Sequence, residues 1–204
     1  MFALSDSRIL LAATALYCQA LSGPAVAALD ASSTVIDGSA PDAPRNDTLC
    51  NSSIECGRLG SSYVEGKSVR RDFERAARYF EAGCDLGDMK SCLGAAEIRR
   101  GGIGARKDEK QALRLFLRVC DAGIPRGCRF AGEIYEVGSR VPDVVPQDQA
   151  KAAGLYERAC DGGEGVSCDS LANLYDTGHG VQKDRRRAKA LRVKARKLGF
   201  DSRE

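Results

Sequence analysis

The sequence predicts an all-α protein, a solenoid in which four helical hairpins stack in chain order. Three copies of one cassette support this prediction: two cysteines eight residues apart, with a glycine three residues after the first. Apolar residues at helical spacing precede each copy, and the pattern repeats with a base period of 36 residues. Because one helical hairpin cannot bury its apolar face alone, such units must stack on one another. The cassettes are Cys84, Gly87 and Cys92; Cys120, Gly123 and Cys128; and Cys160, Gly163 and Cys168.

Each cassette is expected to join the end of one helix to the start of the next. The segment before each cassette opens with an aspartate, a residue type that caps helix N-termini. The glycine can adopt the left-handed conformation that ends many helices. The first cysteine would then lie in the last turn of one helix, and the second would open the next. A bridge between them would hold consecutive helices in an antiparallel hairpin. The capping aspartates are Asp72, Asp108 and Asp148.

The same residue types recur at fixed distances from Cys56 and from the second cysteine of each cassette. A small residue stands four on, a tyrosine seven on in three copies, and a glycine ten on. We expect the small residues to let helices approach closely and the tyrosines to fill the groove between them. The small residues are Gly60, Ala96, Gly132 and Ala172, and the tyrosines are Tyr63, Tyr135 and Tyr175, with Arg99 in the remaining copy. The expected pairs, each a short and a longer helix, are 57–66 with 72–86, 92–101 with 108–122, 128–138 with 148–162 and 168–178 with 184–199.

The first 27 residues are typical of a signal peptide that is cleaved. A charged start at Arg8 precedes an apolar run, and Ala25 and Ala27 form a small-x-small cleavage site. The run is shorter than the ~20 residues of a membrane span, although an uncleaved anchor or a buried helix is the alternative. Residues 28–49 are rich in Ala, Ser, Asp and Pro and indicate a flexible linker, so the repeat domain is expected over 50–204.

The repeat pattern resembles the Sel1-like repeats, relatives of the tetratricopeptide solenoids. The segment from Leu59 through Gly60 and Tyr63 to Gly66 matches the Leu-Gly-x-x-Tyr-x-x-Gly pattern of that family directly. The paired cysteines resemble those of the Helicobacter cysteine-rich proteins, and the resemblance covers about residues 50–199. It implies a right-handed α/α superhelix with a disulfide inside each repeat. Cys50 and Cys56 depart from the pattern because they are only six residues apart.

Loss of the first 27 residues would remove Cys18 and leave eight cysteines, an even number that fits a disulfide framework. Eight cysteines allow 105 connectivities, and local pairing is favoured because each pair recurs within one unit. By the chain-entropy model each small ring contributes roughly 2–3 kcal/mol. Zinc binding is disfavoured because there is no C-x-x-C motif and only one histidine; free buried cysteines are the remaining alternative. The favoured pairs are Cys50–Cys56, Cys84–Cys92, Cys120–Cys128 and Cys160–Cys168.

No constellation of residues specifies a chemical reaction, so no catalytic residue, metal or cofactor is predicted. The sequence contains no G-x-S-x-G, P-loop or Ser-x-x-Lys motif, and His179 is expected to lie exposed in a glycine-rich loop. The resemblance to the cysteine-rich subfamily nevertheless implies penicillin-type β-lactams as ligands. A β-lactam or peptidoglycan-fragment binder with weak β-lactamase activity is therefore the alternative function.

The predicted function is binding of proteins or peptides by a scaffold or adaptor in a bacterial periplasm or a secreted milieu. The stacked first helices would form an extended groove, which the hydroxyls of Tyr63, Tyr135 and Tyr175 could reach from the core. A net charge of +3 with mixed signs does not indicate nucleic acid, and no membrane span is expected in the mature chain. The basic last helix is interpreted as a polar cap that closes the solenoid, or alternatively as a patch for anionic lipid, polysaccharide or an acidic partner. A purely structural repeat is a third possibility.

Overall fold

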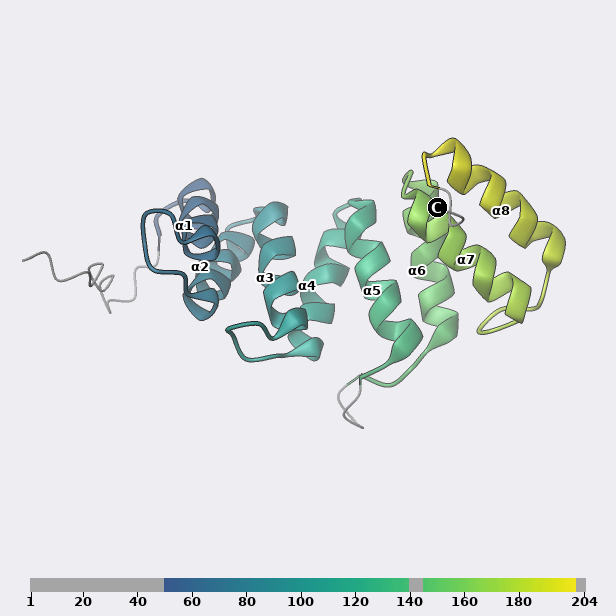
Figure 1. The fold of residues 1–204 in the computed structure, drawn as a ribbon, viewed down its shortest axis with the longest axis horizontal. Coiled ribbons are helices and arrows are strands. Elements are labelled where there is room, and N and C mark those ends of the chain that lie inside the picture. The colour runs from purple at the N-terminus through teal and green to yellow at the C-terminus, as the bar shows by residue number, and fades with distance from the viewer. Residues whose placement is uncertain (1–49, 140–144, 201–204) are drawn as a thin grey trace, which may run out of the picture. The chain divides into compact units, whose positions relative to one another are not determined.

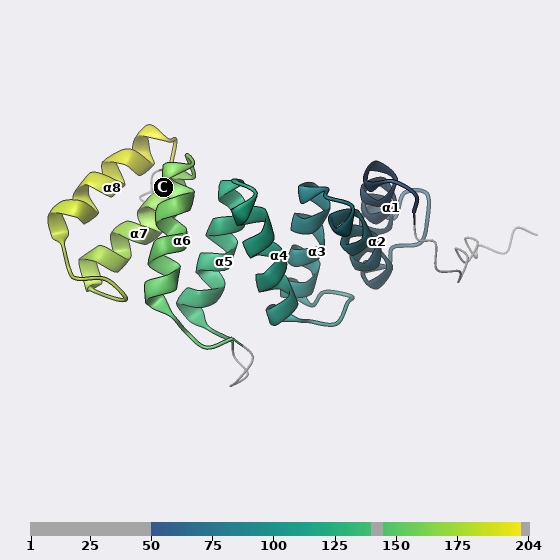
Figure 2. The same cartoon turned by 180° about the vertical axis from the view of Figure 1, so that it is seen from behind.

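The computed structural model describes residues 50–139 and 145–200, which contain eight α-helices of 13 residues each (Figures 1 and 2). The predicted signal peptide 1–27 and linker 28–49 lie outside the described residues. Within the described ranges, no helix is long and apolar enough to cross a membrane. The helices are α1 (Ser53–Glu65), α2 (Phe73–Asp85), α3 (Met89–Gly101), α4 (Glu109–Asp121), α5 (Pro125–Val137), α6 (Gln149–Asp161), α7 (Gly165–Thr177) and α8 (Arg185–Lys197).

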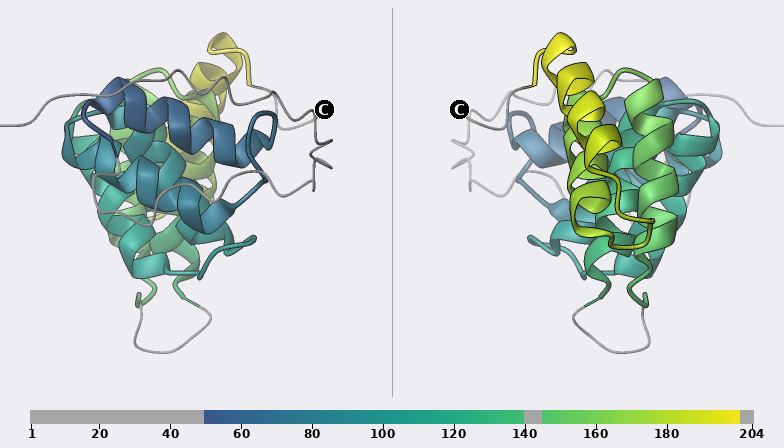
Figure 3. Two further views of the ribbon diagram at one scale, coloured as in Figure 1. Left: turned by 90° about the vertical axis from the view of Figure 1, so that its left-hand side faces the viewer. Right: turned by 90° about the vertical axis from the view of Figure 1, so that its right-hand side faces the viewer.

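The helices pack in chain order, each against the next, as four consecutive hairpins. The end-on views in Figure 3 place α1 and α8 at opposite ends of this series. The predicted all-α solenoid of helical hairpins is therefore confirmed. The four hairpins are α1–α2, α3–α4, α5–α6 and α7–α8.

The sequence pattern suggested that the first helix of each hairpin is shorter than the second. This prediction is wrong, because both helices of every hairpin have 13 residues. Helix α3 begins at Met89, and Cys92 is its fourth residue instead of its first. The reason is the tightness of the turn, in which Gly87 takes the left-handed conformation (φ 91°) and the backbone N–H of Asp88 donates to the carbonyl of Gly83 at 3.0 Å. Asp88 then caps α3 at once, so the next helix starts a full turn before its cysteine.

The loop inside each hairpin is longer than the turn between hairpins, and one aspartate connects it to both helices of the hairpin. The side chain of Asp72 accepts a hydrogen bond from the backbone N–H of Arg75 at 2.9 Å and caps α2, while its own N–H donates to the carbonyl of Tyr63 at 3.1 Å. The same two bonds recur in the other hairpins, so the predicted caps are confirmed and each closes its loop onto the preceding helix. The equivalent aspartates are Asp108, Asp148 and Asp184.

Small residues on the first helices receive aromatic rings from the second helices. A Cβ atom added to Gly60 would lie 2.7 Å from the ring of Phe80, and one added to Gly132 would lie 2.8 Å from the ring of Tyr156. Ala96 and Ala172, at the same repeat position, are fully buried. The close approach predicted for these positions is confirmed, and the two helices of each hairpin are in direct contact.

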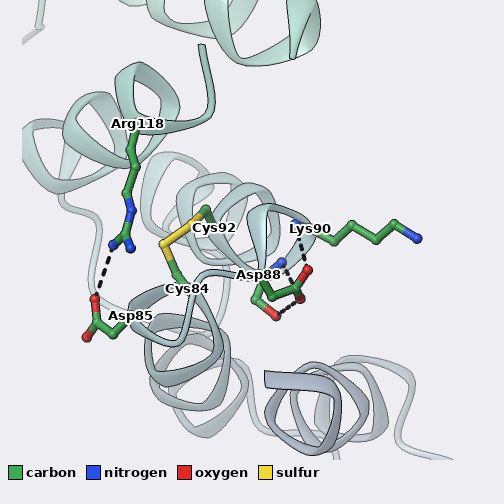
Figure 4. The surroundings of a disulfide bond; sticks show 7 residues. Cys84, Asp85, Asp88, Lys90, Cys92 and Arg118 are labelled. Carbon is green, nitrogen blue, oxygen red and sulfur yellow. Dashed lines mark hydrogen bonds and ion pairs between the residues drawn. A yellow bond between two sulfur atoms is a disulfide. The ribbon is translucent and has the colours of Figure 1, made fainter. Parts of the chain in front are cut away.

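Four disulfides cross-link the chain within the repeats, as predicted. Three of them join the last turn of one hairpin to the first turns of the next, with Cα atoms 4.5–4.7 Å apart and every sulfur-bearing residue buried. Figure 4 shows one of them, between Cys84 on α2 and Cys92 on α3. The fourth ties Cys50, which precedes α1, to Cys56 within that helix. The three bonds that join consecutive hairpins, each between cysteines eight residues apart, are Cys84–Cys92, Cys120–Cys128 and Cys160–Cys168.

Ion pairs accompany the disulfides along the series of second helices. The aspartate that follows each first cysteine pairs with a cation on the second helix of the next hairpin. Figure 4 shows the first of these pairs beside its disulfide. They form one regular ladder, in which the aspartate of each second helix pairs with a cation of the next second helix. The pairs are Asp85–Arg118 at 3.3 Å, Asp121–Arg158 at 3.1 Å and Asp161–Lys194 at 2.7 Å.

Gly60→Ala tests the close approach of α1 and α2. The added methyl group would overlap the ring of Phe80, so we expect the free energy of unfolding to fall by about 1–3 kcal/mol. The matched control is Gly154→Ala in α6, where nothing lies within 4 Å of the added Cβ and a small gain of about 0.5–1 kcal/mol is expected from helix propensity. Urea unfolding of the oxidised chains measures both changes, and equal effects would contradict the packing argument.

Tyr156→Phe tests a buried hydroxyl. Burial, reinforced by the hydrogen bond to Glu136 at 2.6 Å, raises the pKa of Tyr156 well above its ordinary value. Since the folded-state pKa is raised, the stabilisation is fully present below the unfolded pKa of about 10 and declines as the pH rises further. The variant should lose less stability than the wild type between about pH 8 and about pH 11 in urea unfolding. An unchanged slope would show that this hydroxyl is not responsible.

Candidate protein-binding surface

The three tyrosines proposed from the sequence pack against the helix that follows them. Tyr63 is only 4% exposed, and its ring stacks on Tyr79 with centroids 5.5 Å apart. Tyr135 and Tyr175 are half-buried. A cation from the second helix of the same hairpin lies over each ring, so the structure assigns the rings to helix packing, while contact of their hydroxyls with a partner stays a prediction. The cations are Arg75 at 5.9 Å from Tyr63, Lys151 at 5.3 Å from Tyr135 and Arg187 at 4.5 Å from Tyr175.

In the second hairpin a buried salt-bridge network replaces the tyrosine. Arg99 is 8% exposed, and its guanidinium binds Glu81 at 2.7 Å and Glu74 at 3.0 Å. Gln111 on α4 donates to the same carboxylate of Glu81 at 2.9 Å. The hydrogen bond to Glu81 raises the pKa of Arg99 against the opposing effect of burial. The sequence marked Arg99 as an exception, and the two glutamates on α2 are the signal that could have explained it.

The first helices leave one stripe of side chains uncovered, and it is richest on α5. Arg126, Phe130, Glu133 and Val137 lie at successive third and fourth positions there, and all are exposed or half-buried. The ring of Phe130 packs against Phe116 beneath it, with centroids 4.9 Å apart. Sequence analysis missed this surface because Phe130 stands at a position that is not aromatic in the other copies.

Three guanidinium groups surround the ring of Phe130. Arg129 lies 3.9 Å from the ring centroid, and Arg100 and Arg126 each lie 5.4 Å away. Such cation–π contacts hold the arginines over the ring. We refer to these three arginines, Phe130 and two of the three glutamates that bind them as the Phe130 patch; the third glutamate is Glu164, which binds Arg129 at 3.0 Å. Its residues are Glu97, Arg100, Arg126, Arg129, Phe130 and Glu133.

Acidic side chains hold the arginines of the Phe130 patch in place. Glu133 binds Arg100 at 2.8 Å and Arg129 at 2.5 Å, and Glu97 binds Arg126 at 2.7 Å. The Phe130 patch therefore joins α3 to α5. Because its charges are paired, it offers oriented hydrogen-bond donors and acceptors without a large net charge.

A hollow of about 320 Å³ opens beside the Phe130 patch. Ile134 and Val137 supply apolar walls, and Lys107 binds Glu109 across the rim at 2.6 Å. Hydrogen bonds from Lys107 and Ser139 lower the pKa of Glu109. The volume is at the lower end of the range for ligand sites, which suits a single side chain or a peptide end. The lining residues are Arg100, Lys107, Glu109, Glu133, Ile134, Val137 and Gly138.

The part of the chain that the structure describes contains no cluster of side chains that could hold a metal ion. There, no three side chains of the His, Cys, Asp and Glu types come together as metal ligands. His179 is exposed in the α7–α8 loop, as expected, and its backbone N–H donates to the carbonyl of Leu174 at 3.2 Å. The arrangement on the first helices is suited to binding.

A protein of this architecture is an α-solenoid of helical repeats. The family model of the Sel1 repeat matches residues 56–88, 90–124, 125–164 and 166–200, which is most of the chain. The chain therefore belongs to the Sel1 repeat family, as its resemblance predicted. No curated protein matches the sequence.

Several solved structures are similar to this chain. The Sel1 repeat protein from Oxalobacter formigenes is 22% identical, with a TM-score of 0.63 over 76% of this chain and 62% of its own. The protein c5321, a protective antigen present in uropathogenic Escherichia coli strains, is 27% identical, with a TM-score of 0.66 over 74% of this chain and 32% of its own. This chain thus spans less than two thirds of either protein. Helicobacter pylori cysteine rich protein B is 28% identical over 67% of this chain and 95% of its own, with a TM-score of 0.49.

The boundaries of the matched repeats give the disulfides a second description. Cys84 lies near the end of the repeat 56–88, and Cys92 lies near the start of the repeat 90–124. The next two bonds likewise connect the end of one matched repeat to the start of the next. Each bond is within a unit when the unit runs from one second helix to the following first helix. When the unit is the hairpin, the same bond links neighbouring repeats. The disulfides therefore fix the stacking of one hairpin on the next.

Arg99→Gln tests the buried network. Removal of the guanidinium leaves Glu81 and Glu74 without their cation, so we expect a loss of about 2–4 kcal/mol in the free energy of unfolding. The control Arg126→Gln breaks an exposed ion pair and should change stability by less than about 1 kcal/mol. The double variant Arg99→Tyr with Glu81→Gln, which places the family's tyrosine on a neutral neighbour, should recover part of the loss. A single variant as stable as the control would refute the network's role.

Proposed function

We propose that this protein is an exported scaffold that binds another protein or a peptide through the Phe130 patch and the adjoining hollow. The single observation that carries the proposal is an aromatic ring held at the surface among three oriented arginines, next to a hollow with apolar walls. Aromatic and arginine side chains dominate the energetics of protein interfaces. A hollow beside them would accept one side chain of the partner.

The rigidity of the Phe130 patch supports this proposal. Phe130 rests on Phe116 in the core, and each arginine of the patch already binds a glutamate. Binding would therefore immobilise few side chains that were mobile before, and this lowers the entropic cost of association. The mixed charge of the patch favours a partner that carries both polar and apolar side chains over a highly charged polymer.

The disulfides support a site of action outside the cytoplasm. Four disulfides in a chain of this size are typical of an oxidising compartment. Together with the signal-like sequence of residues 1–27, they favour a periplasmic or secreted location. An adaptor role in complexes of the cell envelope is the function that best joins this location to a binding surface.

Affinity capture from an envelope extract, with the oxidised chain as bait, tests the proposal. Val137→Arg would fill the hollow from a side chain that is 71% exposed, so the fold should be unaffected while partner capture falls by about tenfold. Phe130→Ala should weaken capture as well. The matched control is Leu86→Arg, an exposed apolar residue in the α2–α3 turn, which should leave capture unchanged.

Two outcomes would overturn the proposal. One is a partner that both surface variants retain as well as the wild type does, since the Phe130 patch would then not be the site. The other is the absence of any captured protein together with retention or turnover of radiolabelled benzylpenicillin by the oxidised chain. In that case the β-lactam function would take the place of the scaffold.

A further inference from the structure

We propose that the outward face of α8 is a second docking surface, for a protein segment rich in aspartate and glutamate. The basic face, as we call it, consists of five exposed cations on α8. The helix itself contains no acidic residue. This surface lies at the opposite end of the helix series from α1 (Figure 3). It is separate from the Phe130 patch, whose residues lie on α3 and α5. The residues of the basic face are Arg185, Arg186, Lys189, Arg196 and Lys197.

Three cations of α8 stand at repeat positions where the earlier second helices have an aromatic ring, a cysteine and an aspartate. Arg192 stands where the earlier second helices have the ring that packs on the first helix, Phe80, Phe116 or Tyr156. Arg196 stands at the position of the first cysteine, and Lys197 at the position of the aspartate of the ion-pair ladder. The last second helix therefore presents cations where the others present a sulfur and a carboxylate.

The cations of α8 that face α6 and α7 bind carboxylates. Arg187 pairs with Glu157 at 2.6 Å and Lys194 with Asp161 at 2.7 Å, both on α6. Arg192 pairs with Asp176 on α7 at 2.5 Å. All three are bonds to carboxylates of neighbouring helices. The cations of the basic face make no side-chain ion pair or hydrogen bond with any other described residue.

Helical geometry places Arg186, Lys189 and Lys197 away from the core, with Arg185 and Arg196 on the flank of the same side. Ala188 and Ala195 are buried against the rest of the array. Arg186 and Lys197 lie almost opposite these two alanines at 100° per residue, and Lys189 lies on the same outer half of the helix. The cations extend over the full length of α8, roughly 16–18 Å from Arg185 to Lys197 at 1.5 Å per residue. A partner segment of a few helical turns could meet them all.

Charge complementarity identifies the partner as an acidic protein segment. Elsewhere in the array, each contact between successive second helices pairs a carboxylate with a cation, and Lys197 in place of the aspartate leaves α8 with cations alone. A complementary surface must supply the carboxylates, which the forked guanidinium groups of the three arginines bind in a bidentate way. A membrane is disfavoured because only Val193 and Leu198 are large exposed apolar residues on α8, too few for insertion.

Fluorescence anisotropy with the oxidised full chain tests this proposal. The probe is a fluorescein-labelled helical peptide with glutamates along one face, and its glutamine counterpart is the control ligand. We expect the glutamate peptide to bind in a salt-dependent manner. Arg186→Glu with Lys189→Glu and Lys197→Glu should weaken its binding by about tenfold. The matched variant reverses three exposed cations on α2 and α4, Arg78, Lys110 and Arg114. It changes the net charge by the same amount, and it should weaken binding by less than about threefold because these cations lie outside the basic face.

Circular dichroism spectra of both triple variants verify that the fold is retained. Equal weakening by the two variants would overturn the proposal, because binding would then reflect net charge and not the basic face. Failure of the wild type to distinguish the glutamate peptide from the glutamine peptide would also overturn it. So would binding to phosphatidylglycerol vesicles without binding to the peptide, which would assign the basic face to an anionic membrane. None of these outcomes bears on the Phe130 patch, since the variants leave it unchanged.

Discussion

The cross-linked turn between consecutive hairpins is the constraint on which the rest of the structure depends. Gly87, in the left-handed conformation, reverses the chain within two residues, and the Cys84–Cys92 bond holds the two helices that the turn joins. The same turn recurs at Gly123 and Gly163. An alanine in place of such a glycine would strain the backbone whatever space is available. Because the turn is so short, the angle between hairpins has little freedom, and the first helices are held in a fixed register.

Compensating substitutions keep that turn packed from copy to copy. Ser91 sits over Gly83, where an added Cβ would lie 2.7 Å from the serine hydroxyl oxygen. In the next copy the larger residue is on the other helix: Val119 takes the place of Gly83, and Gly127 takes the place of Ser91. A Cβ atom added to Gly127 would lie 2.7 Å from a methyl group of Val119. In both copies one residue of the pair is glycine and the other fills the space above it, as close packing requires. The repeats are thus alike in geometry while their sequences vary in pairs.

The two binding surfaces that we propose lie where one copy departs from the others. The Phe130 patch exists because α5 carries an aromatic ring and two arginines at positions that are smaller or polar in the neighbouring first helices. The basic face exists because α8 replaces cysteine and aspartate with cations. Residues that are identical in all copies maintain the stack, so a surface that distinguishes one partner from another has to be built from the exceptions.

Local rules were sufficient to predict the helices, the caps and the cross-links. An aspartate cap, a left-handed glycine and two cysteines eight residues apart act within one turn of chain, so their consequences can be worked out without knowing the rest of the fold. The prediction that the first helices are short was wrong because α3, α5 and α7 each begin directly after the tight turn, at Met89, Pro125 and Gly165. In each turn the backbone N–H of the residue after the glycine donates to a carbonyl five residues earlier, and only α3 adds a side-chain cap, from Asp88.

The sequence by itself determined the repeat, its period and the residues that the stack buries. Only the tertiary structure decided what the exceptions do. Arg99 is satisfied by glutamates 18 and 25 residues before it, and the arginines around Phe130 come from two helices. Such contacts depend on the superposition of one hairpin on the next, which a pattern within a single repeat does not contain. Periodicity therefore specifies the scaffold, whereas distances between non-equivalent residues of different repeats specify the surfaces that it carries.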